Sequence, residues 1–112
     1  MTIFYDKLDE IFRLQKEFQE KLHNENIVFN QEFISFQTLA CIDELMEALR
    51  ETKWKPWKKN QKFNIYNFRD ELIDAFHFLV NLCLASGLTA DKMYELFIMK
   101  NKLNNERHEN DY

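Results

Sequence analysis

The sequence predicts an all-α fold: a compact core resembling a four-helix bundle, in a single domain that covers residues 1–112. Only one glycine and one proline interrupt the 112 residues, whereas residues that suit long helices, such as Leu, Glu, Lys and Met, are plentiful. Apolar residues recur at the three- and four-residue spacing of amphipathic helices. A chain of this length builds one modest core and not a second.

The first two helices are predicted from their apolar stripes and from one capping residue. We expect the first helix from Ile3 to about Leu22 and the second from Gln31 to about Thr52. Asn30 is the expected N-cap of the second helix, because its side chain can accept a hydrogen bond from the first turn. The stripe of the first helix consists of Leu8, Ile11, Phe12, Leu14, Phe18 and Leu22.

The third and fourth helices are predicted from breakers and caps near residue 87. Asn67 is the expected N-cap of a third helix from Phe68 to about Ser86. Gly87 follows in the position that ends many helices, and Thr89 then caps the fourth helix. With so short a connection, we expect the third and fourth helices to form an antiparallel hairpin.

Two pairs of carboxylates on two predicted helices are the main functional signal. Glu44 and Glu47 are three residues apart, as are Glu71 and Asp74, so each pair lies on one helix face. The first pair alone is typical of a solvated acidic face. The second pair opens a segment that is apolar on nearly every side, which predicts a buried helix. Four carboxylates that converge need a hard divalent cation with oxygen ligands, so we predict a magnesium site.

The segment Lys53-Trp54-Lys55-Pro56-Trp57-Lys58 breaks the helical pattern. Pro56 stops the helix, because the residue before a proline is disfavoured in the α conformation. Aromatic faces interleaved with lysines suit a flat, anionic ligand, since the rings stack on bases and the ammonium groups attract phosphates. The alternative is a loop whose tryptophans anchor it to the core while its lysines stay in solvent.

Charge, cysteine usage and hydropathy limit the classes of function. The net charge is −4 and the basic residues are scattered, so a nucleic-acid polymer is not an obvious partner. Cys41 and Cys83 are isolated within apolar stretches, which is typical of buried thiols in a reduced, cytoplasmic protein. The longest apolar stretch is interrupted by His77 and Asn81, so secretion and membrane spanning are not expected.

Other polar side chains are weaker candidates. Gln15 lies beside the apolar stripe of the first helix, where its amide could reach a cleft, although exposed glutamines on helices are ordinary. His77 is interpreted as a hydrogen-bonded core histidine rather than a metal ligand. On the last helix, Lys100, Asn104 and Arg107 recur at i, i+4 and i+7. This stripe is either a solvated helix end or a set of contacts for a polyphosphate chain.

Taken together, these motifs resemble a known family. The two acidic pairs resemble the signature of the MazG-like all-α NTP pyrophosphatases, and further motifs resemble their dimeric dUTPase branch from about Leu14 to Tyr112. Those motifs are Leu14-Gln15, Trp54-Lys55-Pro56-Trp57-Lys58, Asp74-Ala75-Phe76-His77-Phe78-Leu79 and Lys100-Asn101-x-x-Asn104-x-x-Arg107.

The resemblance implies a homodimeric enzyme that hydrolyses a deoxynucleoside triphosphate to the monophosphate and diphosphate. It implies Mg²⁺ as the cofactor, and it favours Glu44 as the general base. The residues that it assigns are Glu44, Glu47, Glu71 and Asp74 for the metal; Lys58, Lys100, Asn104, Arg107 and Tyr112 for the phosphates; and Gln15 with Trp54 or Trp57 for the base. Pairing of two chains also has a physical motive, because eleven phenylalanines in so small a chain leave apolar surface to cover.

The resemblance has two departures. The family pattern usually has a glycine before its tyrosine, where this chain has Asp111, and the chain lacks a helical insertion found in many dimeric dUTPases, which indicates a compact, phage-type member. Because a glutamine amide offers a donor and an acceptor, the sequence does not separate dUTP from dCTP. The leading hypothesis is a dUTP pyrophosphatase; the alternatives are a dCTP-preferring or broad NTP pyrophosphatase and a catalytically silent helical interaction module.

Overall fold

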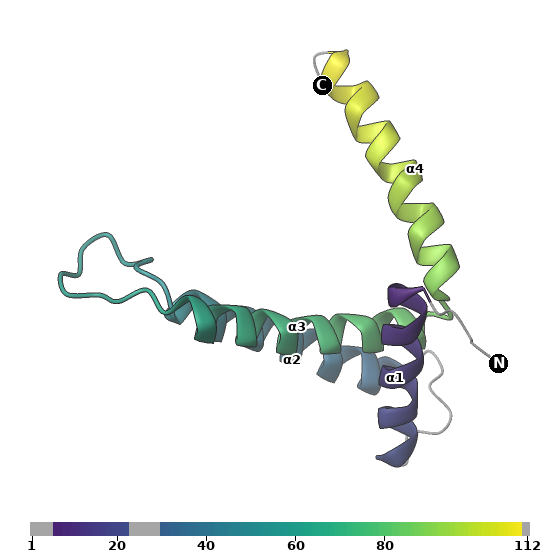
Figure 1. Ribbon diagram of the computed structural model, residues 1–112, viewed down its shortest axis with the longest axis horizontal. Coiled ribbons are helices and arrows are strands. Elements are labelled where there is room, and N and C mark those ends of the chain that lie inside the picture. Colours follow the sequence, from purple (N-terminus) through teal and green to yellow (C-terminus); the bar gives the residue numbers. More distant parts are fainter. Residues whose placement is uncertain (1–5, 23–29, 111–112) are drawn as a thin grey trace.

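A computed structural model describes residues 6–22 and 30–110 of the chain, and this described part consists of four α-helices joined by loops. The helices are α1 (Lys7–Lys21), α2 (Gln31–Arg50), α3 (Ile65–Ala85) and α4 (Ala90–Glu109) (Figure 1). The predicted all-α fold class is therefore confirmed.

Two of the predicted helix caps are confirmed by their hydrogen bonds. The Asn30 side chain accepts a hydrogen bond from the backbone N–H of Phe33 at 3.1 Å, and α2 begins at the next residue, as expected. The Thr89 hydroxyl accepts from the N–H of Lys92 at 3.1 Å and starts α4. Each cap satisfies a donor that the first helical turn leaves without a partner.

Two predicted helix starts are wrong, in both cases because another residue is the cap. The first helix begins at Lys7 rather than at Ile3, because Asp6 has extended backbone angles and accepts from the N–H of Leu8. The third helix begins one turn earlier than expected. Asn64, not Asn67, is its N-cap and accepts from two backbone N–H groups, at 3.1 Å each.

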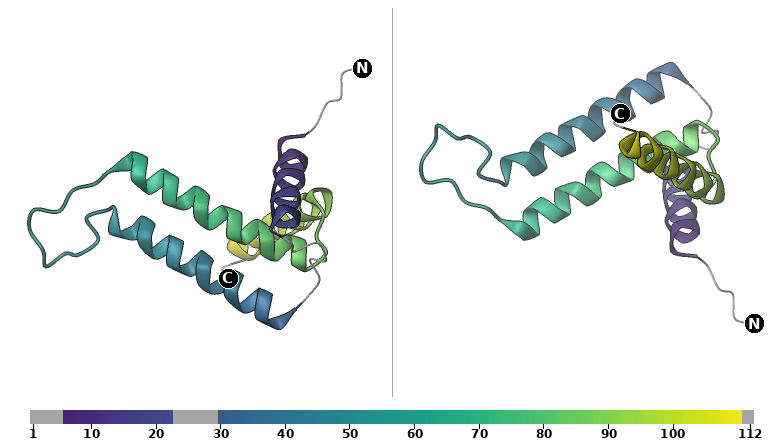
Figure 2. Two further views of the ribbon diagram at one scale, coloured as in Figure 1. Left: turned by 90° about the horizontal axis from the view of Figure 1, so that it is seen from below. Right: turned by 90° about the horizontal axis from the view of Figure 1, so that it is seen from above.

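Helix α3 packs against both α1 and α2, and α4 packs against α1. Helices α2 and α3 run antiparallel along each other, and residues 51–64 connect them at one end (Figure 2). Helix α1 packs on α3 and on the start of α4. At this junction Phe12, Val80 and Ala90 form a buried cluster, against which Phe76 and Met93 pack.

The antiparallel hairpin predicted for the third and fourth helices is wrong, because the axis turns by 102° between α3 and α4. Gly87 lies in the left-handed region at φ 83°. Its N–H donates to the carbonyl of Leu84, and the N–H of Leu88 donates to that of Cys83. These are the two bonds of a Schellman motif, which ends α3 and directs the chain away from it. The antiparallel pair is formed by α2 and α3 instead.

The single chain is more open than a closed bundle. Its radius of gyration is 17.7 Å, whereas a compact domain of this length has about 13 Å. Helix α3 was expected to be buried on every side, yet Leu72, Ile73 and Leu79 are 37%, 55% and 43% exposed. The cysteines expected to be buried, Cys41 and Cys83, are free and half-buried. Among residues 6–22 and 30–110, much of the apolar surface of the helices therefore has no cover.

No single helix among the described residues is long and apolar enough to cross a membrane. Helices α3 and α4 pass such a test only when they are taken as one pair, by length and composition alone, and that pair is sharply bent.

Candidate functional site

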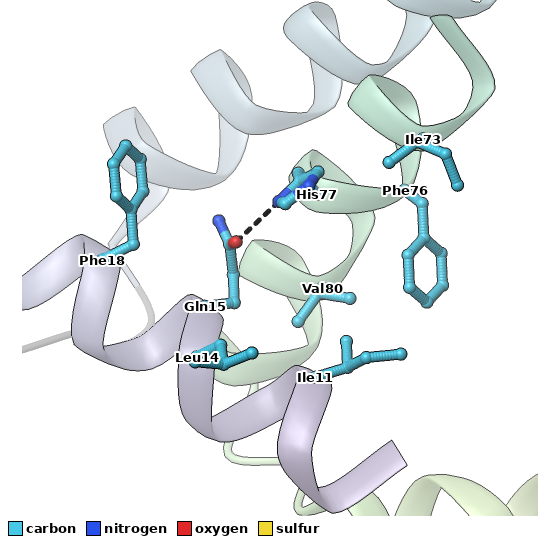
Figure 3. A pocket seen from close by; sticks show the side chains of 8 residues that line it. All are labelled: Ile11, Leu14, Gln15, Phe18, Ile73, Phe76, His77 and Val80. Carbon is cyan, nitrogen blue, oxygen red and sulfur yellow. Dashed lines mark hydrogen bonds between the residues drawn. The ribbon is translucent and has the colours of Figure 1, made fainter. Parts of the chain in front are cut away.

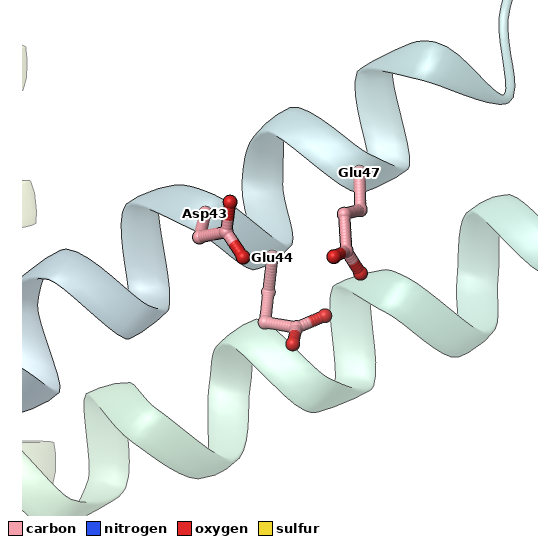
Figure 4. A group of neighbouring side chains, drawn as sticks. All are labelled: Asp43, Glu44 and Glu47. Carbon is pink, nitrogen blue, oxygen red and sulfur yellow. The ribbon is translucent and has the colours of Figure 1, made fainter.

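The predicted carboxylates converge between α2 and α3. Carboxylate oxygens of Glu44, Glu71 and Asp74 all lie within 4.8 Å of one another. A second group of the same size contains Asp43, Glu44 and Glu47, so Glu44 belongs to both groups. Glu44 and Glu47 extend from α2 toward the facing helix (Figure 4). The two acidic pairs therefore face each other across the hairpin.

Glu44 has the most perturbed environment in this cluster. Its pKa is raised from 4.5 to about 7, first by a hydrogen bond with Glu71, then by burial, and then by a hydrogen bond with Glu47 and the charges of both residues. The pKa of Glu71 is raised as well: its hydrogen bond with Glu44 lowers the pKa, but a hydrogen bond with Glu47, burial and the charges of Glu47 and Asp74 outweigh that contribution. Crowded carboxylates thus hold a proton near neutral pH.

The donor set fits a hard divalent cation. Glu44 Oε2 is buried and has no hydrogen-bond partner among the described residues, and an orphaned buried oxygen of this kind is costly unless a ligand satisfies it. All the converging groups are carboxylates, which Mg²⁺ prefers. Asp43 was not among the predicted ligands. Spacing alone could not select it, because adjacent residues on a helix point in different directions.

Gln15 is buried, and a chain of polar side chains holds it in place. Its Nε2 donates to Asn81 Oδ1 at 2.8 Å, while its Oε1 lies 2.7 Å from His77 Nδ1. Asn81 Nδ2 in turn donates to Gln37 Oε1 at 2.8 Å. The amide of Gln15 therefore has a fixed orientation and is not one of the ordinary exposed glutamines of a helix surface.

A cavity of about 430 Å³ opens beside this polar chain, between α1 and α3 (Figure 3). Its walls are mostly apolar, and Gln15 and His77 supply its polar groups; the other lining residues are Ile11, Leu14, Phe18, Ile73, Phe76 and Val80. His77 follows Asp74 by three residues, so both lie on one face of α3. The cavity and the carboxylates are thus neighbours along the same helix.

Sequence reasoning assigned no functional role to three members of this polar chain: His77, Asn81 and Gln37. His77 was interpreted as a core histidine: its hydrogen bonding is confirmed, but the side chain is exposed and lines the cavity. Asn81 is only 2% exposed and was read as an interruption of an apolar stretch. The available signal was its spacing of four residues from His77, which places both side chains on one face.

The tryptophan loop does not bury its aromatic rings. Trp54 is 38% and Trp57 is 72% exposed, and the two rings contact each other edge to face at 5.8 Å. The Gln61 side chain pins the loop through hydrogen bonds with the backbone of Lys55 and Lys58. The structure thus disfavours the alternative in which both tryptophans anchor the loop in the core.

Lys58 lines a second cavity, of about 390 Å³, within this loop. Its lining is mostly polar, and four of the lining side chains are cationic: Arg50, Lys55, Lys58 and Lys62. The cavity lies beyond the last turn of α2 and is separate from the one that Gln15 lines.

The predicted phosphate contacts of the last helix are not brought to the carboxylates within one chain. Lys100, Asn104 and Arg107 are exposed on α4, which extends away from the α2–α3 pair (Figure 1). Tyr112 and the Asp111 departure lie outside the described residues. The roles of these side chains stay predictions.

The fold and the site define a class of protein: an all-α domain with facing carboxylate pairs on an antiparallel helix pair, next to an apolar cavity with fixed polar groups. A family model described as dUTPase matches residues 7–86. The chain belongs to this dUTPase family. The match contains α1, α2 and α3 with the tryptophan loop, and α4 lies beyond it.

Curated relatives come from bacteriophages. The chain is 29% identical to a dCTP pyrophosphatase of Enterobacteria phage T4, over 68% of this chain and 53% of that protein. It is 35% identical to a dCTP pyrophosphatase of Enterobacteria phage LZ5, over 53% of this chain and 41% of that protein. The chain therefore spans about half the length of the relatives it matches. No solved structure matches it significantly.

Proposed function

We propose that this chain is a Mg²⁺-dependent hydrolase that converts a pyrimidine deoxynucleoside triphosphate, with dUTP as the leading substrate, to the monophosphate and diphosphate. The observation that carries the proposal is the convergence of Glu44, Glu71 and Asp74 within 4.8 Å, on the helices that the dUTPase family model covers. The adjoining cavity, with its few fixed polar groups, is of the kind that binds small ligands.

Four carboxylates would hold the metal: Glu44, Glu47, Glu71 and Asp74. When bound, Mg²⁺ supplies positive charge to the phosphate oxygens and lowers the pKa of coordinated water. Glu44 is the favoured general base. Its carboxylate, deprotonated when the metal is bound, could accept a proton from the attacking water.

The base would lie in the cavity next to Gln15 and His77. Because Gln15 presents its amide oxygen to His77 Nδ1, the imidazole donates from Nδ1, and a neutral imidazole would then have Nε2 as an acceptor. An acceptor at this place can receive either the N3–H of uracil or the amino group of cytosine. Phe76 lines the same cavity and is a candidate for the apolar wall that rejects a ribose 2′-hydroxyl.

Hydrolysis of dCTP is the second candidate, and the names of the phage relatives favour it. Both relatives described above are dCTP pyrophosphatases, whereas the family model is described as dUTPase. The polar groups of the cavity are compatible with either base, so the choice between them depends on measured rates.

A homodimer is part of this proposal. The radius of gyration well above the compact value and the exposed apolar residues on all four helices support pairing of two chains. Sedimentation should give twice the chain mass, and a monomer at micromolar concentration would contradict this part of the proposal.

A panel of nucleotides tests the proposed reaction. Diphosphate release is measured with Mg²⁺ for dUTP, dCTP, dTTP, dATP and UTP; we expect the fastest release with dUTP and the slowest with the purine and ribose nucleotides. Glu47→Gln should abolish release, while Glu17→Gln, on the exposed face of α1, should not change it. Equal rates on all nucleotides would contradict the assignment to pyrimidines. No release, together with no thermal shift by Mg²⁺ and a non-hydrolysable dUTP analogue, would identify a silent interaction module.

A further inference from the structure

We propose that each nucleotide site is completed in trans: the Lys100, Asn104 and Arg107 face of α4 in one chain lies over the carboxylates of a second copy. This inference rests on the proposed function for its ligand, a nucleoside triphosphate. It adds the arrangement that supplies cations to a cluster consisting only of acids.

The first step is that α4 is held in place at its start. Ala90 is 5% exposed and belongs to the buried cluster with Phe12, and Met93 packs against that cluster. The Schellman motif at Gly87 and the Thr89 cap fix the backbone just before it. Rotating α4 onto its own α3 would break these contacts.

The second step is that α4, held this way, makes no direct contact with its own carboxylates. Lys100 lies eleven residues after Thr89, and Asp74 lies eleven residues before Ala85. At 1.5 Å per residue, and with the axis turning by 102° between the helices, the backbones of Lys100 and Asp74 are about 20 Å apart. A lysine side chain does not span that distance.

The third step is that α4 lacks cover from the described part of its own chain. Its start packs in the cluster with Phe12 of α1. Its other large apolar side chains are exposed: Tyr94 62%, Leu96 38%, Phe97 65%, Ile98 48%, Met99 65% and Leu103 38%. These positions lie on several sides of the helix, and a helix with apolar residues on several sides is normally buried. The chain thus forms an L, with the α2–α3 pair as one arm and α4 as the other (Figure 1).

The fourth step concerns charge: the acidic and basic residues of α4 balance in number, but its Lys100, Asn104 and Arg107 face carries cations and no acid. The side chains that act on Glu44 and Glu71 are all acidic, namely each other, Glu47 and Asp74. On the other arm, Lys100 is exposed and makes no ion pair with a described residue. Two L-shaped copies related by a two-fold axis can place each α4 in the angle of the other. A triphosphate between them would then meet carboxylates with metal on one side and cations on the other.

Mixing two inactive variants tests this arrangement. Glu44→Gln removes a carboxylate, and Lys100→Glu reverses a cation; each alone should lose diphosphate release while keeping its helical content and dimeric state. In a heterodimer with sites built in trans, one site carries both substitutions and the other carries neither. An equal mixture should therefore recover about a quarter of the wild-type rate. Lys102→Glu, on another side of α4, is the matched control and should keep activity.

The outcomes separate this inference from the proposed function. An active wild type with no recovery in the mixture overturns the inference, because sites built in cis stay defective in every dimer. The mixture should also bind a non-hydrolysable dUTP analogue, with a stoichiometry of about one site per four chains. A wild type that is inactive on every nucleotide would refute the proposed function instead.

One further measurement needs no nucleotide. A zero-length reagent that joins amines to carboxylates is applied to a mixture of ¹⁴N- and ¹⁵N-labelled chains. We expect cross-linked peptides of mixed isotope content that join Lys100 to Glu71 or Asp74. Cross-links from Lys100 to these residues only within one isotope, or none at all, would overturn the placement of α4.

Discussion

Mg²⁺ binding should release a proton from Glu44, and the apparent affinity should depend on pH in a defined way. Without metal, the pKa of this carboxyl is about 7, because Glu71 and Glu47 hydrogen-bond to it and repel its charge and because it is partly buried. A metal ligand has to be deprotonated. Binding and protonation of Glu44 therefore compete.

The magnitude follows from the pKa. One pH unit below it, about nine in ten Glu44 side chains are protonated, so the apparent affinity for Mg²⁺ falls about tenfold from its plateau and about one proton is released per ion. One unit above the pKa, about one in ten Glu44 side chains is protonated, so the affinity is close to its plateau and few protons are released per ion. The affinity thus rises with pH through neutrality and then levels off.

Calorimetric titration with Mg²⁺, in pairs of buffers with different ionisation enthalpies, measures both the affinity and the proton count. Glu44→Gln removes this proton, so it should bind more weakly and with a smaller dependence on pH than the native chain; Glu71, whose pKa is also raised, accounts for what remains. Glu17→Gln, which removes a partner of Arg13 on the surface of α1, should behave as the wild type. An affinity of the native chain that stays constant from one unit below to one unit above that pKa would refute the reasoning.

Three further predictions concern stability and binding. The pKa of Glu44 is raised above its ordinary 4.5, so protonation of Glu44 stabilises the metal-free fold fully below pH 4.5, and this contribution is lost as the pH rises through about 7. Thermal melting without metal should therefore show a lower melting temperature above pH 7 than at pH 5. Saturating Mg²⁺ should reduce this difference. Asn81→Leu leaves Gln15 Nε2 and Gln37 Oε1 without partners in a buried place, so urea denaturation should show a loss of about 1–3 kcal/mol; an unchanged midpoint would mean that water replaces both bonds. Trp57→Ala removes a ring that is 72% exposed, so stability should change by less than about 0.5 kcal/mol. Within one chain this loop is separate from the cavity that Gln15 lines, so nucleotide binding should weaken about tenfold only if the loop of a second copy stacks the ring on the base; equal affinities would exclude that contact.

The sequence predicted those parts of the fold that local chemistry determines. Asn30 and Thr89 are followed directly by helical spacing, and both are caps. At the start of α3 the same rule had two candidates, since Asn64 and Asn67 are each followed by apolar or aromatic residues. Both can accept a hydrogen bond from the first turn. Only the fold decides between them.

The direction of α4 was beyond local reasoning. A short connection with Gly87 predicts where α3 ends, but two helices joined in this way can adopt a wide range of crossing angles. The angle here follows from burying Ala90 and Met93 against Phe12, a contact between segments far apart in the sequence. For the same reason, the tail stripe with Lys100 was predicted correctly as a helix face, but its spacing alone did not place it relative to the carboxylates.

Part of the site was predictable because helical spacing restricts it. Residues three apart on a helix share a face, so the packing of α2 against α3 was enough to bring Glu44, Glu71 and Asp74 together. The polar chain through Asn81 was not predictable in this way. An amide within an apolar helix can face any neighbour, and its partners Gln15 and Gln37 come from two other helices.

An acidic site for an anionic substrate has a further consequence. The proposed substrate is a polyanion, while the cluster that is to receive its phosphates carries Glu44, Glu47, Glu71 and Asp74. Like charges about 4 Å apart repel by about 4 kcal/mol near a protein surface, so metal-free protein should bind a non-hydrolysable dUTP analogue at least a hundredfold more weakly than protein with Mg²⁺. Equilibrium binding with and without a chelator measures this ratio. Lys100→Ala should weaken binding in Mg²⁺ by a smaller factor, since a lysine supplies one charge and the ion two. An analogue that binds equally well with the chelator would place the phosphates away from the carboxylates.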